Sequence, residues 1–367
     1  MRIVLTGGVT GGHLTPLVAV AKKIQEKVPE VEFIFIGPKG KLEEEIIGRE
    51  NIPIRNILTG KLRRYFSLKN FVDFFRVPLG IIQALWWLLV YMPDAIFSKG
   101  GAASFPVVVA GWLYRIPILT HESDANPGLA NSIIGKFSTR VAVAYSEAEK
   151  YFPAEQVVLT GNPLRENITQ GDVQKARSLF GLTESRKTIL ILGGSQGAAS
   201  INARILRILP DLLRKYQVIH QTGEANFSEV EHRAGEMGIK NGREGYHAVG
   251  FLKEELLDAL AVADLVISRA GATAIAEIAA NKKPAIIIPL ENSAGDHQRM
   301  NAYSLARAGG CVVMEENNMG KHMLLEKIDQ IMNDESLRNK LITNIGKFYH
   351  PEAAEKIANG ILGMIEK

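Results

Sequence analysis

The stretch ADLVISRAGATAIAEIAANKKPAIIIPLENSAGDHQRMNA, residues 263–302, decides the fold of this chain. An apolar strand from Asp264 to Ser268 leads into a turn at Gly271, and a helix begins near Thr273. A second apolar strand, 285–289, follows the helix. A strand, a glycine turn, a helix and a strand in this order predict a parallel βαβ unit, and therefore an α/β fold.

The turn at Gly271 is also a candidate anion site. Free backbone N–H groups and about half a positive charge gather at the N-terminus of a helix after such a turn. Glu277, one turn into the helix, can accept hydrogen bonds from both hydroxyls of a ribose. The stretch indicates a seat for a nucleoside diphosphate, although an ordinary βαβ unit in which Gly271 only makes a turn fits these residues equally well.

The pattern of strand, glycine-rich loop and helix occurs twice more. Residues 2–6 precede GGVTGGH at 7–13, and residues 188–192 precede GGSQGA at 193–198. The two copies predict two doubly wound domains, each with a mostly parallel sheet. We expect a division at Gly161-Asn-Pro163, giving domains 1–163 and 164–349, and a final helix near 350–367 that crosses back over the first domain.

Composition fits two globular domains. The chain has 367 residues, of which 46% are apolar and 22% charged, so each half can bury a core. The net charge of +4 is small, and no basic stripe is interleaved with aromatic residues, so we expect no nucleic-acid partner. The one cysteine, Cys311, excludes an internal disulfide, and its apolar neighbours predict that it is buried.

A bound metal is not expected. No group of histidines and cysteines has the spacing of metal ligands, and no two aspartates lie two residues apart. Dipoles and side chains would then hold the charge of a diphosphate.

Polar residues follow the predicted strands of the first half, where ligands bind in open α/β sheets. We expect His13 on the glycine loop after the first strand and ahead of a helix at 17–28, and Glu122 lies just past a strand at 116–120. His13 is a candidate for chemistry or a cap of a helix turn. Glu122 is a candidate carboxylate with a catalytic role or a solvated loop acid. The residues alone leave both pairs of alternatives open.

The most hydrophobic segment is FVDFFRVPLGIIQALWWLLVYM, residues 71–92. Its apolar run, 77–92, is interrupted by Pro78 and Gln83 and is shorter than the roughly 20 residues that cross a bilayer. Basic residues accompany it, namely Lys61, Arg63, Arg64, Lys69 and Arg76. This pattern favours a helix lying on an anionic membrane surface. The alternative is a crossover helix buried on all sides.

Six motifs, by their order and spacing, resemble those of the MurG family of bacterial glycosyltransferases, in family 28. They are GGVTGGH at 7–13, HES…NPGLAN at 121–131, GNPLR at 161–165, GGSQGA at 193–198, SRAGATAIAEIAA at 268–280 and DHQ..NA at 296–302. The resemblance covers essentially the whole chain. It implies the GT-B architecture: two Rossmann-like domains facing a cleft, with the acceptor on the first and the nucleotide sugar mainly on the second.

The resemblance also implies an activity. A hexosyltransferase of this family moves N-acetylglucosamine, with inversion, from UDP-N-acetylglucosamine to the 4-hydroxyl of a polyprenyl-diphosphate muramyl-pentapeptide lipid. This step converts lipid I to lipid II in peptidoglycan synthesis, on which cell-wall biogenesis, cell shape and cell division depend. It implies a peripheral enzyme on the cytoplasmic face of the inner membrane, attached through residues 61–92, with no cofactor. A related UDP-sugar hydrolase, a transferase with another lipid acceptor, and a non-catalytic membrane partner of a split glycosyltransferase are the alternatives.

The family's functional residues can be carried over by motif. His13 would be the general base, and Glu122 a second candidate base or an orienter of the acceptor. Thr10, Gly11 and Gly12 would line the site near the donor sugar and diphosphate, and Asp124 and Arg165 would also contact the donor.

The remaining contacts fall in the second half. Ser195 and the helix start at Ala272 and Thr273 would bind the diphosphate, Leu252 the uracil through its backbone, Glu277 the ribose, and Gln298 the sugar hydroxyls. Two positions depart from the family pattern: Val9 stands where glycine is usual, and Asp124 stands where an amide is usual. An ionised carboxylate cannot donate a hydrogen bond, which puts the donor contact of Asp124 in doubt.

Overall fold

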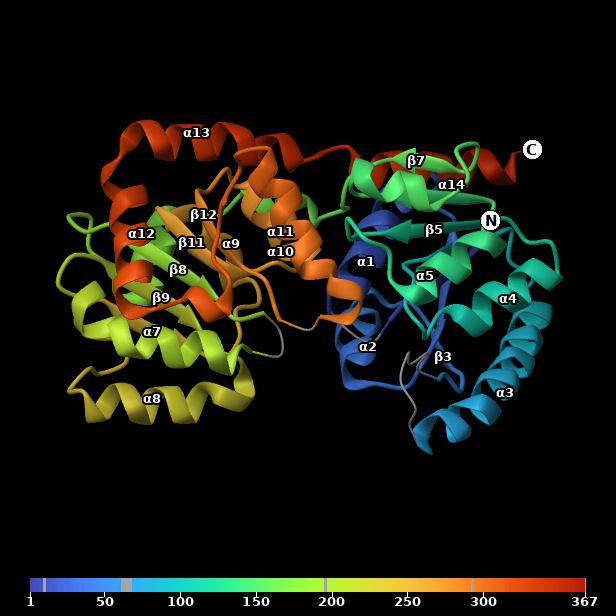
Figure 1. Cartoon of the computed structure of the whole chain (residues 1–367). Helices are drawn as coiled ribbons and strands as arrows, with labels where there is room; N and C mark the ends of the chain where they lie inside the picture. The colour runs from blue at the N-terminus through green and yellow to red at the C-terminus, as the bar shows by residue number, and fades with distance from the viewer. Residues whose placement is uncertain (9–10, 61–67, 195–196, 292, 367) are drawn as a thin grey trace. The chain divides into compact units, whose positions relative to one another are not determined.

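The computed structural model describes residues 1–8, 11–60, 68–194, 197–291 and 293–366. The chain divides into two compact units, Met1–Arg165 with His350–Lys367, and Glu166–Tyr349. Each unit contains one parallel sheet covered by helices (Figure 1). The predicted α/β fold with two doubly wound parallel sheets is confirmed.

The sheet of the first unit has seven parallel strands in the order β3-β2-β1-β4-β5-β6-β7. The strands are β1 Arg2–Thr6, β2 Glu32–Gly37, β3 Ile54–Asn56, β4 Ala95–Ser98, β5 Ile118–Glu122, β6 Arg140–Val143 and β7 Val157–Leu159. The helices are α1 Gly11–Lys27, α2 Lys41–Ile46, α3 Leu68–Tyr91, α4 Phe105–Leu113, α5 Leu129–Ile134 and α14 Ala353–Ile365. The strand order reverses between β1 and β4, where Thr6 pairs with Ser98.

Alternating strand residues bury both faces of this sheet. Ile3 and Leu5 of β1 pack in an apolar cluster with α1 and α14. Val4, between them, packs in a second cluster with α3, α4 and α5. The final helix α14 therefore completes the core of the first unit, although it ends the chain (Figure 1).

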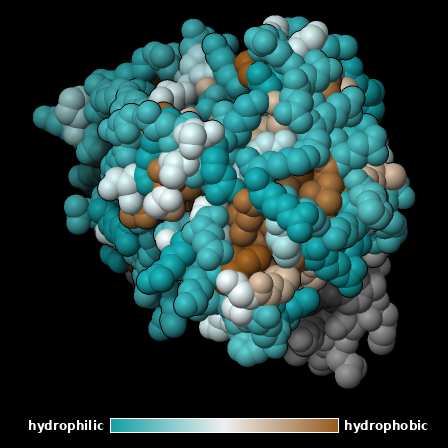
Figure 2. Space-filling model, turned by 90° about the vertical axis from the view of Figure 1, so that its left-hand side faces the viewer, coloured by the Kyte–Doolittle hydropathy of each residue, from teal (hydrophilic) through white to brown (hydrophobic). Residues whose placement is uncertain are grey.

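The sheet of the second unit has six parallel strands in the order β10-β9-β8-β11-β12-β13. The strands are β8 Thr188–Leu192, β9 Gln217–Gln221, β10 Tyr246–Val249, β11 Leu265–Arg269, β12 Ala285–Ile288 and β13 Val312–Val313. The helices are α6 Val173–Phe180, α7 Ala199–Leu212, α8 Phe227–Glu236, α9 Glu255–Val262, α10 Ala272–Ala280, α11 His297–Arg307, α12 Lys321–Asn333 and α13 Glu335–Ile345. The order reverses between β8 and β11. The face of this unit in Figure 2 is largely hydrophilic, with hydrophobic residues gathered near its middle.

The start of α1 differs from the prediction. The helix begins at Gly11 rather than at residue 17, so Pro16 lies inside it and His13 lies in its first turn instead of on a loop. The sequence placed Pro16 near the helix start because an internal proline removes one backbone hydrogen bond. The helix nevertheless includes Pro16 and forms without the hydrogen bond that Pro16 cannot donate. The added turn brings the His13 ring against Gly8.

Cys311 is buried, as predicted, at 7% exposure. Burial raises the pKa of its thiol to about 12, so it behaves as a small apolar side chain.

The contribution of α14 to the first unit can be measured. Ile361 is fully buried in the cluster with β1 and α1. We expect Ile361→Ala to lower the free energy of unfolding of this unit by about 2–5 kcal/mol, because it removes buried methyl groups and leaves a cavity. Urea denaturation would measure this, with Asn359→Ala, an exposed position on the same helix, as the control. Equal effects of the two substitutions would contradict the packing described.

Candidate active site

Two glycine loops of the first unit meet around the His13 ring. They follow β1 and β4, the neighbouring strands at which the strand order reverses. A Cβ at Gly8 would lie 3.1 Å from His13 Nδ1, and a Cβ at Gly101 would lie 3.5 Å from His13 Nε2 and 3.4 Å from Gly8 Cα. Gly101 also has a φ of +82°, which side chains rarely adopt. Glycine therefore allows the backbone to close around the imidazole. Gly11 and Gly12 are the first two residues of α1, the helix that carries His13.

Glu122, the last residue of β5, is only 3% exposed and is held by two hydrogen bonds. Its Oε1 accepts from the Asp124 N–H at 2.8 Å, and its Oε2 accepts from Asn131 Nδ2 at 2.8 Å. Asn131 Oδ1 in turn accepts from the Gly101 N–H at 2.8 Å. Because a Cβ at Gly100 would lie 2.1 Å from Asn131 Oδ1, glycine is required there too. These bonds join Glu122 to the loop that touches His13.

The ionisation of Glu122 is shifted toward neutral pH. Burial, followed by the nearby Asp124 carboxylate, raises the pKa of Glu122 to about 7. The two N–H donors and Lys99 act in the opposite direction. A carboxyl group that titrates near neutral pH can accept or return a proton during a reaction. The solvated-loop alternative for Glu122 is therefore wrong.

The sequence analysis missed Lys99 as a member of this site. Lys99 follows β4 directly and is 1% exposed, and its Nζ donates to Ser123 Oγ at 2.5 Å. Burial lowers its pKa to about 8, against the pull of Glu122 and Asp124. The sequence signal that could have identified Lys99 was the position of a lysine between an apolar strand and two glycines. The sequence analysis took this segment only as a glycine loop.

His121 is a second buried group beside these residues. Its Nε2 donates to the Gly161 carbonyl at 3.0 Å, which ties β5 to the segment that ends the first unit. Burial, with Lys99 adding to it, holds the pKa of His121 well below its ordinary value. The imidazole is therefore neutral at working pH and serves to position the backbone.

In the second unit, α10 begins directly after the turn that follows β11. Gly271 is its N-cap in an extended conformation, and no described side chain caps it. Ala272 is buried and Thr273 half-buried in the first turn, and Glu277 is 9% exposed one turn later. Asn301 of α11 donates from Nδ2 to the Ala270 carbonyl at 3.1 Å and fixes the turn. The arrangement suits an anion at the N-terminus of α10.

Gln221, which the sequence analysis also missed, links the loop after β8 to Leu252. Its Nε2 donates to the Gly194 carbonyl at 3.3 Å, and its Oε1 accepts from the Leu252 N–H at 3.0 Å. The predicted uracil contact through the Leu252 backbone would have to share or exchange this bond if it used the N–H. The available signal was a polar residue at the end of an apolar strand.

Arg269, the last residue of β11, is buried and has a structural role. Its guanidinium donates to Ser200 Oγ at 2.9 Å and to Glu316 Oε1 at 2.5 Å, and it also reaches the Pro289 carbonyl at 3.2 Å. It connects the start of α7 to the strand that leads into the Gly271 turn.

The other predicted residues are placed as follows. Gln298 is the second residue of α11, and its Oε1 accepts from the Leu290 N–H at 3.0 Å. Asp124 and Arg165 are half-buried in the first unit. Thr10, Ser195 and Val9 lie outside the described residues. Among the described residues, no three His, Cys, Asp or Glu side chains are grouped so as to hold a metal ion.

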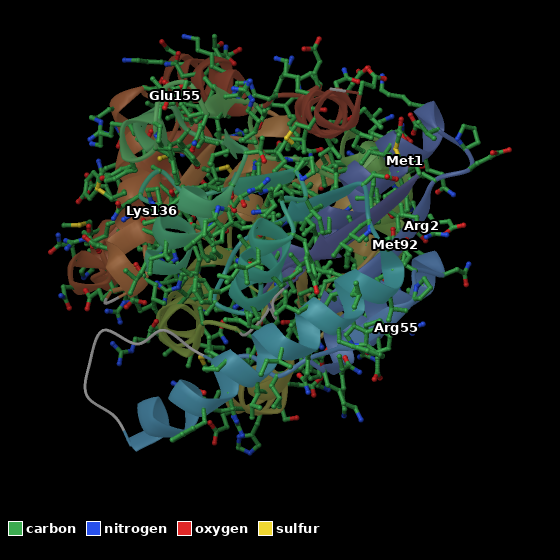
Figure 3. The ribbon with its side chains drawn as sticks, turned by 90° about the vertical axis from the view of Figure 1, so that its right-hand side faces the viewer. Met1, Arg2, Arg55, Met92, Lys136 and Glu155 are labelled. Atoms are coloured by element: carbon green, nitrogen blue, oxygen red, sulfur yellow. The ribbon has the colours of Figure 1, made fainter. Side chains whose placement is uncertain are left out.

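Helix α3 buries one apolar face and exposes another. Gly80, Ala84 and Leu88 face the core. The opposite face, which we call the α3 outer face, consists of Phe75 (53% exposed), Leu79 (50%), Ile82 (62%), Trp86 (61%) and Leu89 (57%). Figure 3 shows α3 lying across the first unit and ending beside Met92. The alternative of a helix buried on all sides is wrong.

Of the basic residues predicted beside α3, Arg76 is exposed on the helix. Lys61, Arg63 and Arg64 lie outside the described residues, as does the side chain of Lys69. None of the described helices is both long and apolar enough to span a bilayer.

Two Rossmann-like parallel-sheet units, each with glycine loops where its strand order reverses, define the GT-B class of glycosyltransferase fold. Residues 3–143 match the glycosyltransferase family 28 N-terminal domain, and residues 188–357 match the family 28 C-terminal domain. A UDP-N-acetylglucosamine–N-acetylmuramyl-(pentapeptide) pyrophosphoryl-undecaprenol N-acetylglucosamine transferase of Bacillus anthracis is 40% identical over 363 residues, 98% of this chain and 99% of the relative. An enzyme of the same name from Clostridium perfringens is 39% identical, covering 100% of this chain and 97% of the relative.

Solved structures share the fold. MurG of Acinetobacter baumannii superposes with a TM-score of 0.76 at 24% identity over 99% of both chains. A UDP-GlcNAc 2-epimerase of Neisseria meningitidis superposes with a TM-score of 0.70 at 13% identity, over 99% of this chain and 100% of the epimerase. The chain belongs to glycosyltransferase family 28, within the MurG family of N-acetylglucosaminyltransferases. The resemblance drawn from the six motifs is confirmed.

The raised pKa of Glu122 predicts how stability depends on pH. The folded-state pKa of about 7 exceeds the ordinary value of 4.5, so the folded state holds this proton more tightly. The stability that protonated Glu122 contributes is complete below pH 4.5 and is lost as pH rises through 7. We expect the free energy of unfolding of the first unit to fall by on the order of 2–3 kcal/mol from this group.

Urea denaturation of wild type and Glu122→Gln between pH 4.5 and 8 would measure this loss. The variant lacks the titrating group and should show a correspondingly flatter profile. Glu352→Gln, exposed on the same unit, is the control and should follow the wild type. Parallel profiles for wild type and Glu122→Gln would show that Glu122 does not titrate in this range.

Proposed function

We propose that this chain transfers N-acetylglucosamine from UDP-N-acetylglucosamine to the 4-hydroxyl of the muramyl-pentapeptide lipid, converting lipid I to lipid II. The observation that carries the proposal is the 40% identity, over nearly the full length of both chains, to enzymes named for this transfer. The two sites described above supply groups of the required kinds.

The second unit would hold the donor. The N-terminus of α10 at Ala272 and Thr273 and the loop with Ser195 would take the diphosphate. Glu277 would accept from the ribose hydroxyls, Gln298 would bind the sugar, and the backbone at Leu252 would meet the uracil. These dipoles and N–H donors would stabilise the charge of the diphosphate, so we expect no bound metal or other cofactor.

The first unit would hold the acceptor and remove its proton. The muramyl oxygen attacks the anomeric carbon, the bond from that carbon to the UDP oxygen breaks, and the configuration inverts. His13 is our candidate for the base, since imidazole titrates near working pH. Glu122 is the second candidate, because its pKa is raised to about 7 and each carboxylate oxygen keeps a lone pair beyond its one hydrogen bond.

The test of the function is release of UDP from UDP-N-acetylglucosamine, with and without a short-chain lipid I analogue. We expect release that depends on the acceptor and a disaccharide product. Release without acceptor would indicate a hydrolase. Binding of UDP without any release would indicate a non-catalytic protein.

His13→Ala should lower kcat by about 10²- to 10⁴-fold if His13 is the base, the usual range for general-base catalysis. UDP binding, measured by calorimetry, should change much less than kcat because the nucleotide contacts are assigned mainly to the second unit. Glu122→Gln in the same assay gives the comparison. Near-normal turnover of His13→Ala would remove His13 from the base role and leave Glu122.

We also propose that the protein docks on the cytoplasmic face of the inner membrane through the α3 outer face. This face is apolar and exposed, and Arg76 lies on the same helix. Apolar side chains inserted at the headgroup boundary, with basic residues beside them, hold a helix on anionic lipid. The polyprenyl acceptor would reach the enzyme from the same surface.

Trp86→Glu and Ile82→Glu should each weaken co-sedimentation with phosphatidylglycerol vesicles by roughly tenfold or more, because a charge replaces an exposed apolar side chain that would insert into the membrane. Leu179→Glu is the matched control, since Leu179 is 46% exposed on α6 of the second unit. Binding that is indifferent to the α3 substitutions, or equally weakened by the control, would overturn this docking surface.

A further inference from the structure

Lys99 is the most completely buried cation of the first-unit site, which is the cluster of polar groups around His13, Glu122 and His121. Both ends of the residue are fixed. Its backbone N–H donates to the Thr6 carbonyl at 2.8 Å, which continues the pairing of β1 and β4. Its Cβ lies 3.3 Å from where a Cβ at Gly7 would be, so the glycine loop closes over its stem. Its Nζ donates to Ser123 Oγ at 2.5 Å.

The groups around the Lys99 ammonium are acidic or neutral. Ser123 lies between Glu122 and Asp124, and both carboxylates act on Lys99 as opposite charges. His121 is fully buried and neutral, and His13 lies nearby on α1. Two carboxylates around one ammonium give the cluster a net charge of −1 when Glu122 is deprotonated.

Burying an ammonium is costly unless opposite charges and hydrogen bonds compensate. An apolar side chain would fill the position at lower cost, so packing alone does not account for a lysine here. The charge of Lys99 acts on the same carboxyl group, Glu122, that is bonded through Asn131 to the loop around His13.

We propose that Lys99 is a positioning residue for the proton-accepting groups of the transfer reaction. Its buried ammonium balances Glu122 and Asp124, and through Ser123 Oγ it fixes the turn that carries both carboxylates. The inference rests on the proposed function and goes beyond it, because it assigns a role to a residue that was not among the proposed substrate contacts.

The sign of the effect follows from the charges. A nearby cation favours the deprotonated form of an acid, so loss of Lys99 raises the pKa of Glu122. A nearby anion has the opposite effect, so loss of the Asp124 charge lowers it. The pKa shifts have the same signs if His13 takes the proton. A neighbouring cation disfavours the imidazolium form, so loss of Lys99 would also raise the pKa of His13.

The test compares wild type, Lys99→Met, Asp124→Asn and the double variant by the pH dependence of kcat/KM for acceptor-dependent UDP release. We expect the acidic limb to move up by about one pH unit in Lys99→Met and down by a similar amount in Asp124→Asn. In the double variant the net charge of the cluster returns to that of the wild type, so the limb should return close to its original position.

A second measurement separates this inference from the proposed function. The carboxyl carbon of Glu122, followed by NMR in the same four proteins, should show the same three shifts even if the wild type has no acceptor-dependent turnover. Absent turnover would then overturn the function alone. UDP binding by the wild type and Lys99→Met checks that the second unit is intact, since only the other two proteins change Asp124, an expected donor contact.

Two observations together would overturn the inference. Lys99→Met would lose activity or folding without any shift of the acidic limb or of the Glu122 titration, and adding Asp124→Asn would not rescue it. If Lys99→Met fails to fold, the double variant decides. Recovery of folding and of the wild-type titration supports charge balance. An unfolded double variant shows that Lys99 acts through packing.

Discussion

The structure depends on the reversal of strand order at the centre of each parallel sheet. Where the order reverses, the connections after two neighbouring strands leave toward opposite faces and a crevice remains at their carboxyl ends. In the first unit these strands are β1 and β4, and in the second they are β8 and β11. His13, in the first turn of α1, and Lys99 follow β1 and β4, and the Gly271 turn follows β11. Apolar side chains on both faces of each sheet pack against the helices that cover them.

Close backbone approach at these crevices requires glycine. The Gly100 and Gly197 positions both have positive φ, and a Cβ at either would lie within 2.3 Å of an asparagine side-chain atom. The space that glycine leaves is filled by polar side chains from neighbouring segments, namely Asn131 of α5 in the first unit and Asn226, in the turn that follows β9, in the second. A larger residue at either glycine would therefore displace the asparagine that packs against it.

The first-unit site keeps several ionisable groups away from water at a considerable desolvation cost. Glu122, Lys99 and His121 are each at most 3% exposed, and burial is the largest cause of the pKa shift of each. Hydrogen bonds and opposite charges within the site offset part of this cost. Helix α3 shows the opposite case, in which apolar groups stay in contact with water. One of its faces completes the core, and the α3 outer face leaves five large apolar side chains exposed.

The sequence by itself determined the α/β class, the two strand–glycine loop–helix copies, and the strongly apolar segment 71–92, which it favoured as a helix lying on a surface. These features depend on local periodicity and turn chemistry, which neighbouring residues carry. The tertiary structure alone decided that Lys99 and Asn131 join Glu122, that Gln221 engages Leu252, and that His13 lies in the first turn of a helix. These contacts link residues far apart in the chain, and the buried charges shift one another only after folding has removed water from between them.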